Sequence, residues 1–173
     1  NGQKVTDLYA LAMDSVRRNA DGAQPIQQDL ADLKGFNRAT FPEFIAYQHM
    51  NLGNPFFGIG VAPDLANSAL NTMYLSAGTM SLTDRDYYLK TDAESKKIQQ
   101  KYRDYLTKMF MLAGYKKKDA QRATNTIYNI EYKFAEASRT RAEQRDIAKL
   151  YNIRTIDQLQ ADYPAIDWKK YLR

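Results

Sequence analysis

His49 is the single histidine available for acid–base or metal chemistry in this 173-residue sequence. A zinc site needs several His, Cys, Asp or Glu side chains around the ion, and a Ser–His–Asp triad also depends on a histidine. No Gly-x-Ser-x-Gly turn accompanies His49, and Gly58-x-Gly60 is too short for a phosphate-binding loop. We therefore predict that His49, late in a helical segment, has a structural role and is bonded to backbone or water.

Glu131 is a candidate general base, because it lies beside the apolar stripe of a predicted helix. A buried carboxylate is more commonly held by a cation. Three arginines follow within reach: Arg139, Arg141 and Arg145. We predict that Glu131 is at least partly buried and structural, in contact with one of these arginines or with a tyrosine hydroxyl.

Two compact charged clusters complete the candidate sites. Asp84-Arg85-Asp86 precedes a predicted helix, and we expect Asp84 or Asp86 to cap its start, where free N–H groups favour an anion. A catalytic pair of carboxylates is the less favoured interpretation. The run at 116–118, three lysines at a predicted helix turn, is interpreted as solvated, with a phosphate or anionic-lipid patch as the alternative.

Composition excludes several classes of protein. The net charge is +5, from 25 basic and 20 acidic residues that are well mixed, which argues against a nucleic-acid-binding protein. The absence of cysteine excludes disulfides, thiolate nucleophiles and Cys-based metal sites. No apolar run approaches the ~18 residues of a membrane span, and residues 1–4 carry no apolar signal-peptide core.

The first third of the chain has helical periodicity. Its first helix is predicted from Lys4 to the break at Asp21-Gly22, with one apolar stripe formed by Val5, Leu8, Tyr9, Ala12 and Val16. A short helix follows over 26–34. A third helix, which we expect Thr40 to cap, extends to about residue 51.

The periodicity then changes from helical to alternating. Apolar side chains alternate with glycines along 56–62, and alternation resumes along 70–77 after a polar turn. We predict an antiparallel β-hairpin from these two segments. Gly58 and Gly60 leave one face nearly bare, which predicts a close approach by another backbone or a helix.

The second half is predicted to be helical throughout. Apolar stripes over 98–110 and 123–137 predict two long antiparallel helices joined at Gly114, which closes the first in a left-handed conformation. A helix over 143–151, one capped by Thr155 and a last turn after Asp167 follow. The fold class is therefore mainly α: a multi-helix domain with one small antiparallel β-hairpin (about 56–62 and 70–77), with 1–173 a single helical domain.

A series of short motifs resembles one known family in order along the chain. Leu82-Thr-Asp-Arg-Asp-Tyr-Tyr-Leu89 resembles the Leu-Pro-x-Arg-Asp-Tyr-Tyr segment of the neprilysin and endothelin-converting-enzyme family of zinc metallopeptidases, which includes the bacterial PepO-like enzymes. Thr83 departs from the proline usual there. Further motifs agree in order, from Asp7-Leu-Tyr9 upstream to Asp167-Trp168 downstream, so the resemblance covers 7–172.

The resemblance implies a two-lobed zinc endopeptidase, of which this chain is a fragment of the N-terminal, mostly helical lobe that caps the catalytic cleft and restricts substrate size. Zinc ligands, His-Glu-x-x-His and the general base belong to the C-terminal thermolysin-like lobe, and none of those motifs occurs here. No catalytic, cofactor-binding or metal-binding residue is therefore carried over, and the fragment alone is expected to be inactive.

The implied partners are the catalytic lobe of the same polypeptide and peptide substrates, with no nucleic acid and no membrane span in the fragment. The implied location is the periplasm or cell surface of a bacterium. The alternative is a free-standing helical module that binds proteins or peptides without enzymatic activity. A reading frame that continues past Arg173 into His-Glu-x-x-His distinguishes the two.

Overall fold

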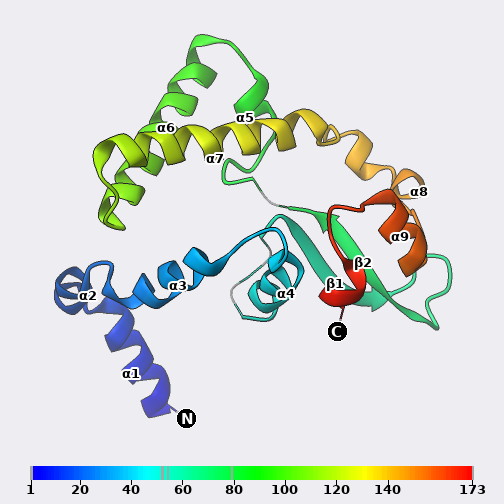
Figure 1. Ribbon diagram of the computed structural model, residues 1–173, viewed down its shortest axis with the longest axis horizontal. Helices are drawn as coiled ribbons and strands as arrows, with labels where there is room; N and C mark the ends of the chain where they lie inside the picture. The colour runs from blue at the N-terminus through cyan, green and yellow to red at the C-terminus, as the bar shows by residue number, and fades with distance from the viewer. Residues whose placement is uncertain (1, 52, 54, 79, 173) are drawn as a thin grey trace.

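The fold is a set of helices around one two-stranded sheet, seen in a computed structural model that describes residues 2–51, 53, 55–78 and 80–172 (Figure 1). The helices are α1 (Gly2–Met13), α2 (Ser15–Asp21), α3 (Gln27–Asp32), α4 (Phe41–Asn51), α5 (Asp86–Leu89), α6 (Ala93–Leu112), α7 (Lys117–Ala137), α8 (Ile147–Leu150), α9 (Ile156–Asp162) and α10 (Trp168–Tyr171). Short 3-10 turns are η1 (Gln24–Ile26), η2 (Leu33–Gly35) and η3 (Glu143–Arg145). The mainly α fold class is confirmed.

The predicted hairpin is present and antiparallel. Strand β1 (Phe57–Pro63) pairs with β2 (Asn71–Ala77) in a register that places Phe57 opposite Ala77 and Pro63 opposite Asn71. The expectation for the bare face was wrong. A methyl group at Gly60 would meet open space, and at Gly58 it would meet the Ser76 side chain of the partner strand, because the cross-strand neighbour fills that room.

The long helices α6 and α7 form the predicted antiparallel pair, which makes up the upper layer of Figure 1. Gly114 ends the first helix with a φ of 97°, a conformation that side chains other than glycine adopt only with strain. Along the pair, Thr107 bonds Thr124 at 3.0 Å, and Tyr102 bonds Glu131 at 2.6 Å. Residue numbers fall on one helix as they rise on the other, as antiparallel packing requires.

Two separate clusters of buried side chains hold these elements together. The first, which we call the tyrosine core, lies between α5, α6 and α7 and contains Tyr88, Tyr102, Tyr128 and Ala135. The second, the tryptophan core, joins α4, the hairpin, α9 and α10 and contains Ile45, Trp168 and Tyr171. The sheet contributes to the second cluster through one face only, from Phe57, Ile59 and Leu75.

Three helix predictions need correction. The first helix is interrupted at Asp14, whose carboxylate accepts the Arg17 N–H at 2.8 Å and so starts a new helix. The helix predicted over 143–151 is likewise divided, into η3 and α8, at Asp146. The Thr40 hydroxyl bonds the Asn37 backbone and does not cap α4. Only the Thr40 backbone carbonyl contacts that helix, by accepting the Phe44 N–H.

The caps predicted farther along the chain are confirmed. Thr155 accepts the Gln158 N–H, and the Gln158 side chain accepts the Thr155 N–H, which together form a capping box for α9. The carboxylate of Asp167 accepts the Lys170 N–H and starts α10. These two caps orient the C-terminal helices that bring Trp168 and Tyr171 to the hairpin.

Candidate functional site

The most concentrated polar arrangement is a carboxylate cage around Glu131. This side chain is 9% exposed and lies on α7, facing α5 and α6. Its Oε1 accepts the Ser81 hydroxyl at 2.6 Å and the Ser81 N–H at 3.2 Å. Its Oε2 accepts the hydroxyls of Tyr102 at 2.6 Å and Tyr88 at 2.9 Å. Four neutral donors therefore occupy both oxygens and join α5, α6 and the segment after β2 to α7.

The cage explains why the pKa values of its two tyrosine hydroxyls are raised. Burial, reinforced by the hydrogen bond to Glu131, raises the pKa of Tyr102 to about 12. Burial also raises the pKa of Tyr88 far above its usual value, although this hydroxyl additionally accepts the Leu82 N–H at 3.0 Å. Both phenols therefore remain protonated and donate to the carboxylate at any physiological pH.

The prediction for Glu131 is confirmed: the side chain is buried, and of the two predicted kinds of partner the structure shows tyrosine hydroxyls rather than an arginine. In the part of the chain that the structure describes, no ion pair joins Glu131 to an arginine, and Arg141 pairs with Asp84 instead. The sequence did not identify which tyrosines, although buried phenols such as Tyr88 and Tyr102 need an acceptor. A carboxylate whose lone pairs face four donors is poorly placed to take a proton from a substrate.

His49 is also fully engaged. Its Nδ1 lies 2.6 Å from the Tyr171 hydroxyl and its Nε2 lies 3.2 Å from the Pro55 carbonyl. Because a carbonyl only accepts, the proton belongs on Nε2 and the Tyr171 hydroxyl donates to Nδ1. Burial raises the pKa of Tyr171, which keeps it a donor. The predicted backbone contact of His49 is present, and the ring also ties α4 to α10.

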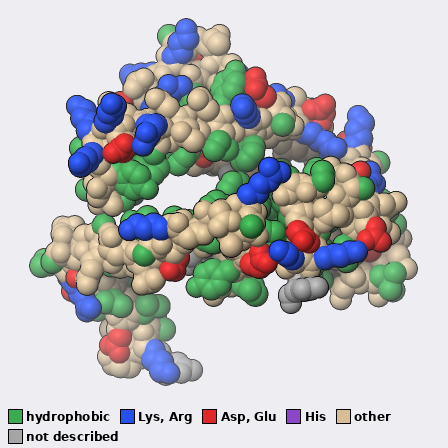
Figure 2. All heavy atoms as spheres, viewed as in Figure 1, with side chains coloured by type: hydrophobic (Ala, Val, Ile, Leu, Met, Phe, Trp, Pro, Cys, Tyr) green, Lys and Arg blue, Asp and Glu red, His purple; other side chains and the backbone are tan. Residues whose placement is uncertain are grey.

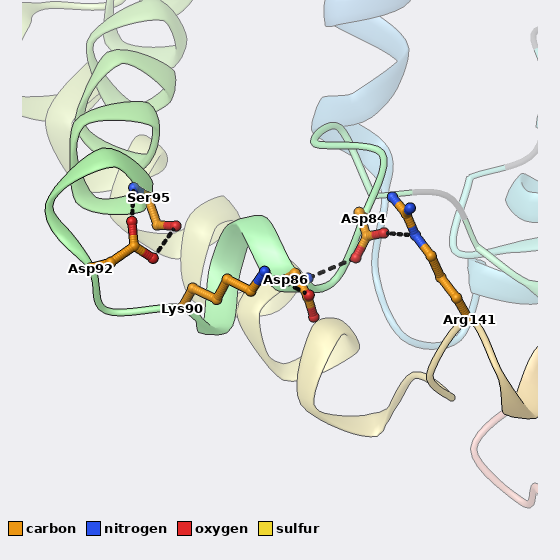
Figure 3. Close-up of polar contacts among 6 residues, drawn as sticks. All are labelled: Asp84, Asp86, Lys90, Asp92, Ser95 and Arg141. Atoms are coloured by element: carbon orange, nitrogen blue, oxygen red, sulfur yellow. Dashed lines mark hydrogen bonds and ion pairs between the residues drawn. The ribbon is translucent and has the colours of Figure 1, made fainter.

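The Asp84-Arg85-Asp86 cluster lies at the start of α5 (Figure 3), but the N-cap is Arg85, which makes no side-chain cap, rather than either aspartate as predicted. The Asp84 carboxylate accepts the Asp86 N–H at 2.9 Å and pairs with Arg141 from the segment after α7. The Asp86 N–H lowers the pKa of Asp84, burial opposes this, and Arg141 adds to the lowering. Asp86 pairs with Lys90 one turn later, at 3.1 Å. Figure 3 shows these groups linked in a row from α5 to Arg141, an arrangement that fixes a helix start.

A second anchoring carboxylate, Asp64, was not singled out from the sequence. It is 8% exposed and accepts the N–H groups of Ala66 and Asn67, both at 2.9 Å, which folds the hairpin turn. The Tyr151 hydroxyl bonds both carboxylate oxygens at 3.1 Å. Although burial opposes it, these donors hold the pKa of Asp64 below its usual value. The turn residues signalled the local part of this site, whereas nothing local signals a partner 87 residues away.

The described side chains do not fit a zinc ion. No group of three or more His, Cys, Asp or Glu side chains converges within 2–51, 53, 55–78 and 80–172. Both ring nitrogens of His49 are already bonded, and both oxygens of Glu131 face donors. The usual ligand set of a zinc site is therefore not assembled by this part of the chain.

The chain exposes more surface than a compact monomer of its mass, and part of that surface is large hydrophobic side chains. The accessible area is 13,474 Å², whereas a compact monomer of 19.9 kDa exposes about 8,700 Å². The N-terminal arm, α1 to α3, contains no buried residue, and Val5, Leu8 and Val16 are 69%, 68% and 81% exposed. Figure 2 shows an open gap between the α6–α7 layer and this arm, with hydrophobic side chains along its margins. Exposed apolar area of this kind marks surfaces that interact with other protein or with a membrane.

None of the described helices has the length and apolar content needed to cross a bilayer.

The fold resembles part of a zinc metalloprotease of known structure. The structure of Mycobacterium tuberculosis zinc metalloprotease ZMP1 in complex with an inhibitor aligns with a TM-score of 0.82 and 25% identity, over 96% of this chain and 25% of that one. The cryo-EM structure of ZMP1 in an open state aligns with a TM-score of 0.81, over 96% of this chain and 26% of that one.

Sequence comparison agrees with the structural comparison. The N-terminal sequence model of peptidase family M13 matches residues 1–173, so this chain belongs to peptidase family M13. It is 27% identical to the human Kell blood group glycoprotein over 99% of the chain and 24% of that protein. It is 29% identical to neprilysin-1 of Caenorhabditis elegans over 96% of the chain and 24% of that protein. The chain thus spans about a quarter of the length of these curated relatives, and the resemblance to the neprilysin family is confirmed.

Proposed function

We propose that this chain is part of the helical cap lobe of a zinc metalloendopeptidase, and that it encloses the catalytic cleft and restricts the size of peptide substrates. The observation that carries the proposal is the M13 match over residues 1–173 together with a fold that aligns to ZMP1 over 96% of the chain. The large uncovered apolar area supports it, because a cap must pack against the rest of its enzyme.

In this proposal the chain supplies no catalytic, cofactor-binding or metal-binding residue. Zinc would be held by the catalytic lobe of the same polypeptide, where it activates the water that attacks a peptide bond. The residues of this chain instead maintain the shape of the cap lobe that encloses the cleft. The Glu131 cage fixes α5 to α7, and the pair of His49 and Tyr171 fixes α4 to the C-terminal helices. A location in the bacterial periplasm or at the cell surface is proposed by family resemblance.

The prediction that this chain is not catalytic is tested by comparing the isolated 173-residue chain with the full-length protein. The purified 173-residue chain, supplied with zinc, should hydrolyse nothing in a mixed peptide library and should retain no stoichiometric zinc after dialysis. Full-length protein should hydrolyse peptides in the library and should retain one zinc ion per chain after dialysis. Cleavage by the isolated chain that persists after rigorous removal of contaminating proteases would refute the proposal, and so would one tightly held zinc per chain.

Substrate-size restriction needs a different comparison. One cleavage sequence is offered to the full-length enzyme as a short free peptide and again within an exposed loop of a folded carrier protein. A cap that closes the cleft predicts that kcat/KM for the carrier is much lower than for the free peptide. Equal values would show that the helical lobe does not limit access. A matched carrier bearing a site for an open-cleft protease controls for loop accessibility.

The exposed apolar faces would equally suit a free-standing helical module that binds protein or peptide. Genomic sequence separates the two possibilities. A reading frame that continues into His-Glu-x-x-His favours the peptidase, and a stop codon directly after Arg173 favours the module.

A further inference from the structure

The free end of the α6–α7 pair combines exposed apolar side chains with lysines, and the proposed function does not account for that combination. Leu112 is 62% exposed, Met111 47% and Tyr115 44%. Lys108 and Lys117 line the same open groove as Met111 and Leu112. In Figure 2, basic side chains crowd over this end of the molecule, with hydrophobic side chains next to them. We call this surface the basic tip: Lys108, Met111, Leu112, Tyr115 and the lysines 116–118.

The lysines of the basic tip have no ion-pair partner in the described part of the chain. All four are exposed, and none of them takes part in an ion pair there. Of the nearby carboxylates, Asp119 pairs with Arg122 at 3.0 Å, and Asp104, which lines the same groove, accepts only the neutral Gln100 amide at 2.9 Å. The four lysines therefore outnumber the one carboxylate at the tip that is not paired with an arginine.

The position of the lysine run adds an electrostatic cost. Lys116 is the N-cap of α7, and Lys117 and Lys118 open its first turn, without a side-chain cap. The helix dipole favours anions at this end and opposes cations, so three consecutive lysines here work against the stability of the helix. A sequence selected only for a stable turn would place Ser, Thr or Asp there. An external anionic surface would turn this cost into a favourable interaction.

We propose that the basic tip is a docking surface for an anionic lipid bilayer. The mixture of residue types favours lipid over a protein partner, because the buried centre of a protein interface is depleted in lysine. At a bilayer surface, lysine stems lie along the apolar boundary while the ammonium groups reach headgroup phosphates. Leu112 and Met111 enter the acyl boundary, and Tyr115 lies at headgroup level. Lysine attraction and shallow apolar insertion supply the two signals that reversible membrane binding needs.

The test is vesicle co-sedimentation of full-length protein in a soluble form, free of any lipid or membrane anchor. Binding is expected to vesicles of phosphatidylcholine with phosphatidylglycerol and not to phosphatidylcholine alone, and it should weaken as salt is raised. The triple variant K116Q/K117Q/K118Q should lower the partition coefficient by about tenfold or more. The charge-matched control K96Q/K97Q/K133Q removes three exposed lysines from elsewhere on α6 and α7 and should leave binding unchanged.

Further measurements distinguish apolar insertion, electrostatic attraction to a bilayer and binding of a free phosphate group. Leu112→Asn removes an exposed apolar side chain, so the protein should still fold, bind anionic vesicles more weakly and keep the same salt dependence. Displacement by millimolar glycerol 3-phosphate would indicate a discrete phosphate site and overturn the bilayer proposal. Equal binding to neutral vesicles, or equal effects of the two triple variants, would also overturn it.

A protein interface at the tip predicts another outcome: the 116–118 variant would change peptide hydrolysis or thermal stability of the full-length enzyme while vesicle binding is absent. That result would refute lipid docking. Because vesicle binding is measured without peptide hydrolysis, the outcome is independent of whether the cap-lobe proposal holds.

Discussion

The tyrosine core and the tryptophan core of this chain are similar in size but are held together by different interactions. In the tyrosine core, Tyr88 and Tyr102 direct their hydroxyls at the charged Glu131 carboxylate. In the tryptophan core, the polar edges meet neutral acceptors: the Trp168 ring N–H donates to the Tyr163 carbonyl at 3.1 Å, and the Tyr171 hydroxyl bonds His49. One cluster depends on a buried anion, and the other depends on packed aromatic area.

The contrast indicates that the two cores have different structural roles. Hydrogen bonds to a buried carboxylate are directional, so the cage specifies how α5, α6 and α7 are placed relative to one another. Aromatic packing is less directional and contributes through the area removed from water. The tryptophan core therefore supplies stability where α4, in the first third of the chain, meets α10 near residue 170.

The largest effect is expected from Trp168→Ala. The ring is 4% exposed and packs against Phe57 and Tyr171 at centroid distances of 5.6 and 5.7 Å. Its removal leaves a cavity and should lower the free energy of unfolding by about 3–5 kcal/mol, measured by urea denaturation. Tyr163→Ala removes a 59% exposed aromatic nearby and is the control, with little expected change. A loss below about 1 kcal/mol for Trp168→Ala would contradict the assignment of this core.

Glu131→Ala tests the other core and should cost less. It leaves Tyr88, Tyr102 and Ser81 without their acceptor, and the unfolding free energy should fall by about 1–3 kcal/mol. Glu131→Gln should also destabilise, because its amide NH₂ would face donors rather than accept from them. Glu136→Gln, an exposed site on the same helix, is the matched control. Equal stability of the Glu131→Gln and Glu136→Gln variants would show that the cage does not need its charge.

Alkaline pH should weaken the tyrosine core selectively. Tyr102 has its pKa raised from 10.0 to about 12 in the folded chain. The folded state therefore holds this proton more tightly, so the associated stability is fully present below pH 10 and is lost as pH rises through 12. Urea midpoints measured across that range should fall more steeply for the parent chain than for Tyr102→Phe, which has no proton to lose. Parallel curves would contradict the coupling.

Sequence reasoning located elements well where the signal was local and repeated. The hairpin followed from alternation, and the α6–α7 pair from two long stripes separated by Gly114, because periodicity reports which face is buried. Helix interruptions at Asp14 and Asp146 were missed. At Asp14 the carboxylate accepts the Arg17 N–H, a local hydrogen bond that outweighs the periodicity. Asp146 is the N-cap of α8 without a side-chain hydrogen bond, and nothing in the local pattern marks that break.

Pairings between distant residues were predicted less well. Burial of Glu131 followed from its place beside a stripe, but its partners depend on how α5 and α6 cross α7, which no local pattern specifies. Charge alone suggested an arginine. The geometry instead placed two phenols and a serine there, and it gave Arg141 to Asp84. Similarly, the bond between Asp64 and Tyr151 joins segments that only the tertiary fold brings together.

The smallest effect is expected at the pair between Asp84 and Arg141, which links the tyrosine core to the segment leading toward the tryptophan core. The Arg141 side chain is 79% exposed, so water and salt screen the attraction. A double-mutant cycle with Arg141→Ala and Asp84→Asn should give a coupling of about 0.2–1 kcal/mol, measured by urea denaturation. The cycle is needed because Asp84 also accepts the Asp86 N–H, so the single Asp84→Asn variant weakens that charge-assisted hydrogen bond as well as removing the pair. Since the pKa of Asp84 is lowered in the folded chain, its contribution is present above the usual aspartate pKa and is lost as pH falls below it. A coupling above about 2 kcal/mol would mean that the two cores are joined much more firmly at this point than an exposed ion pair allows.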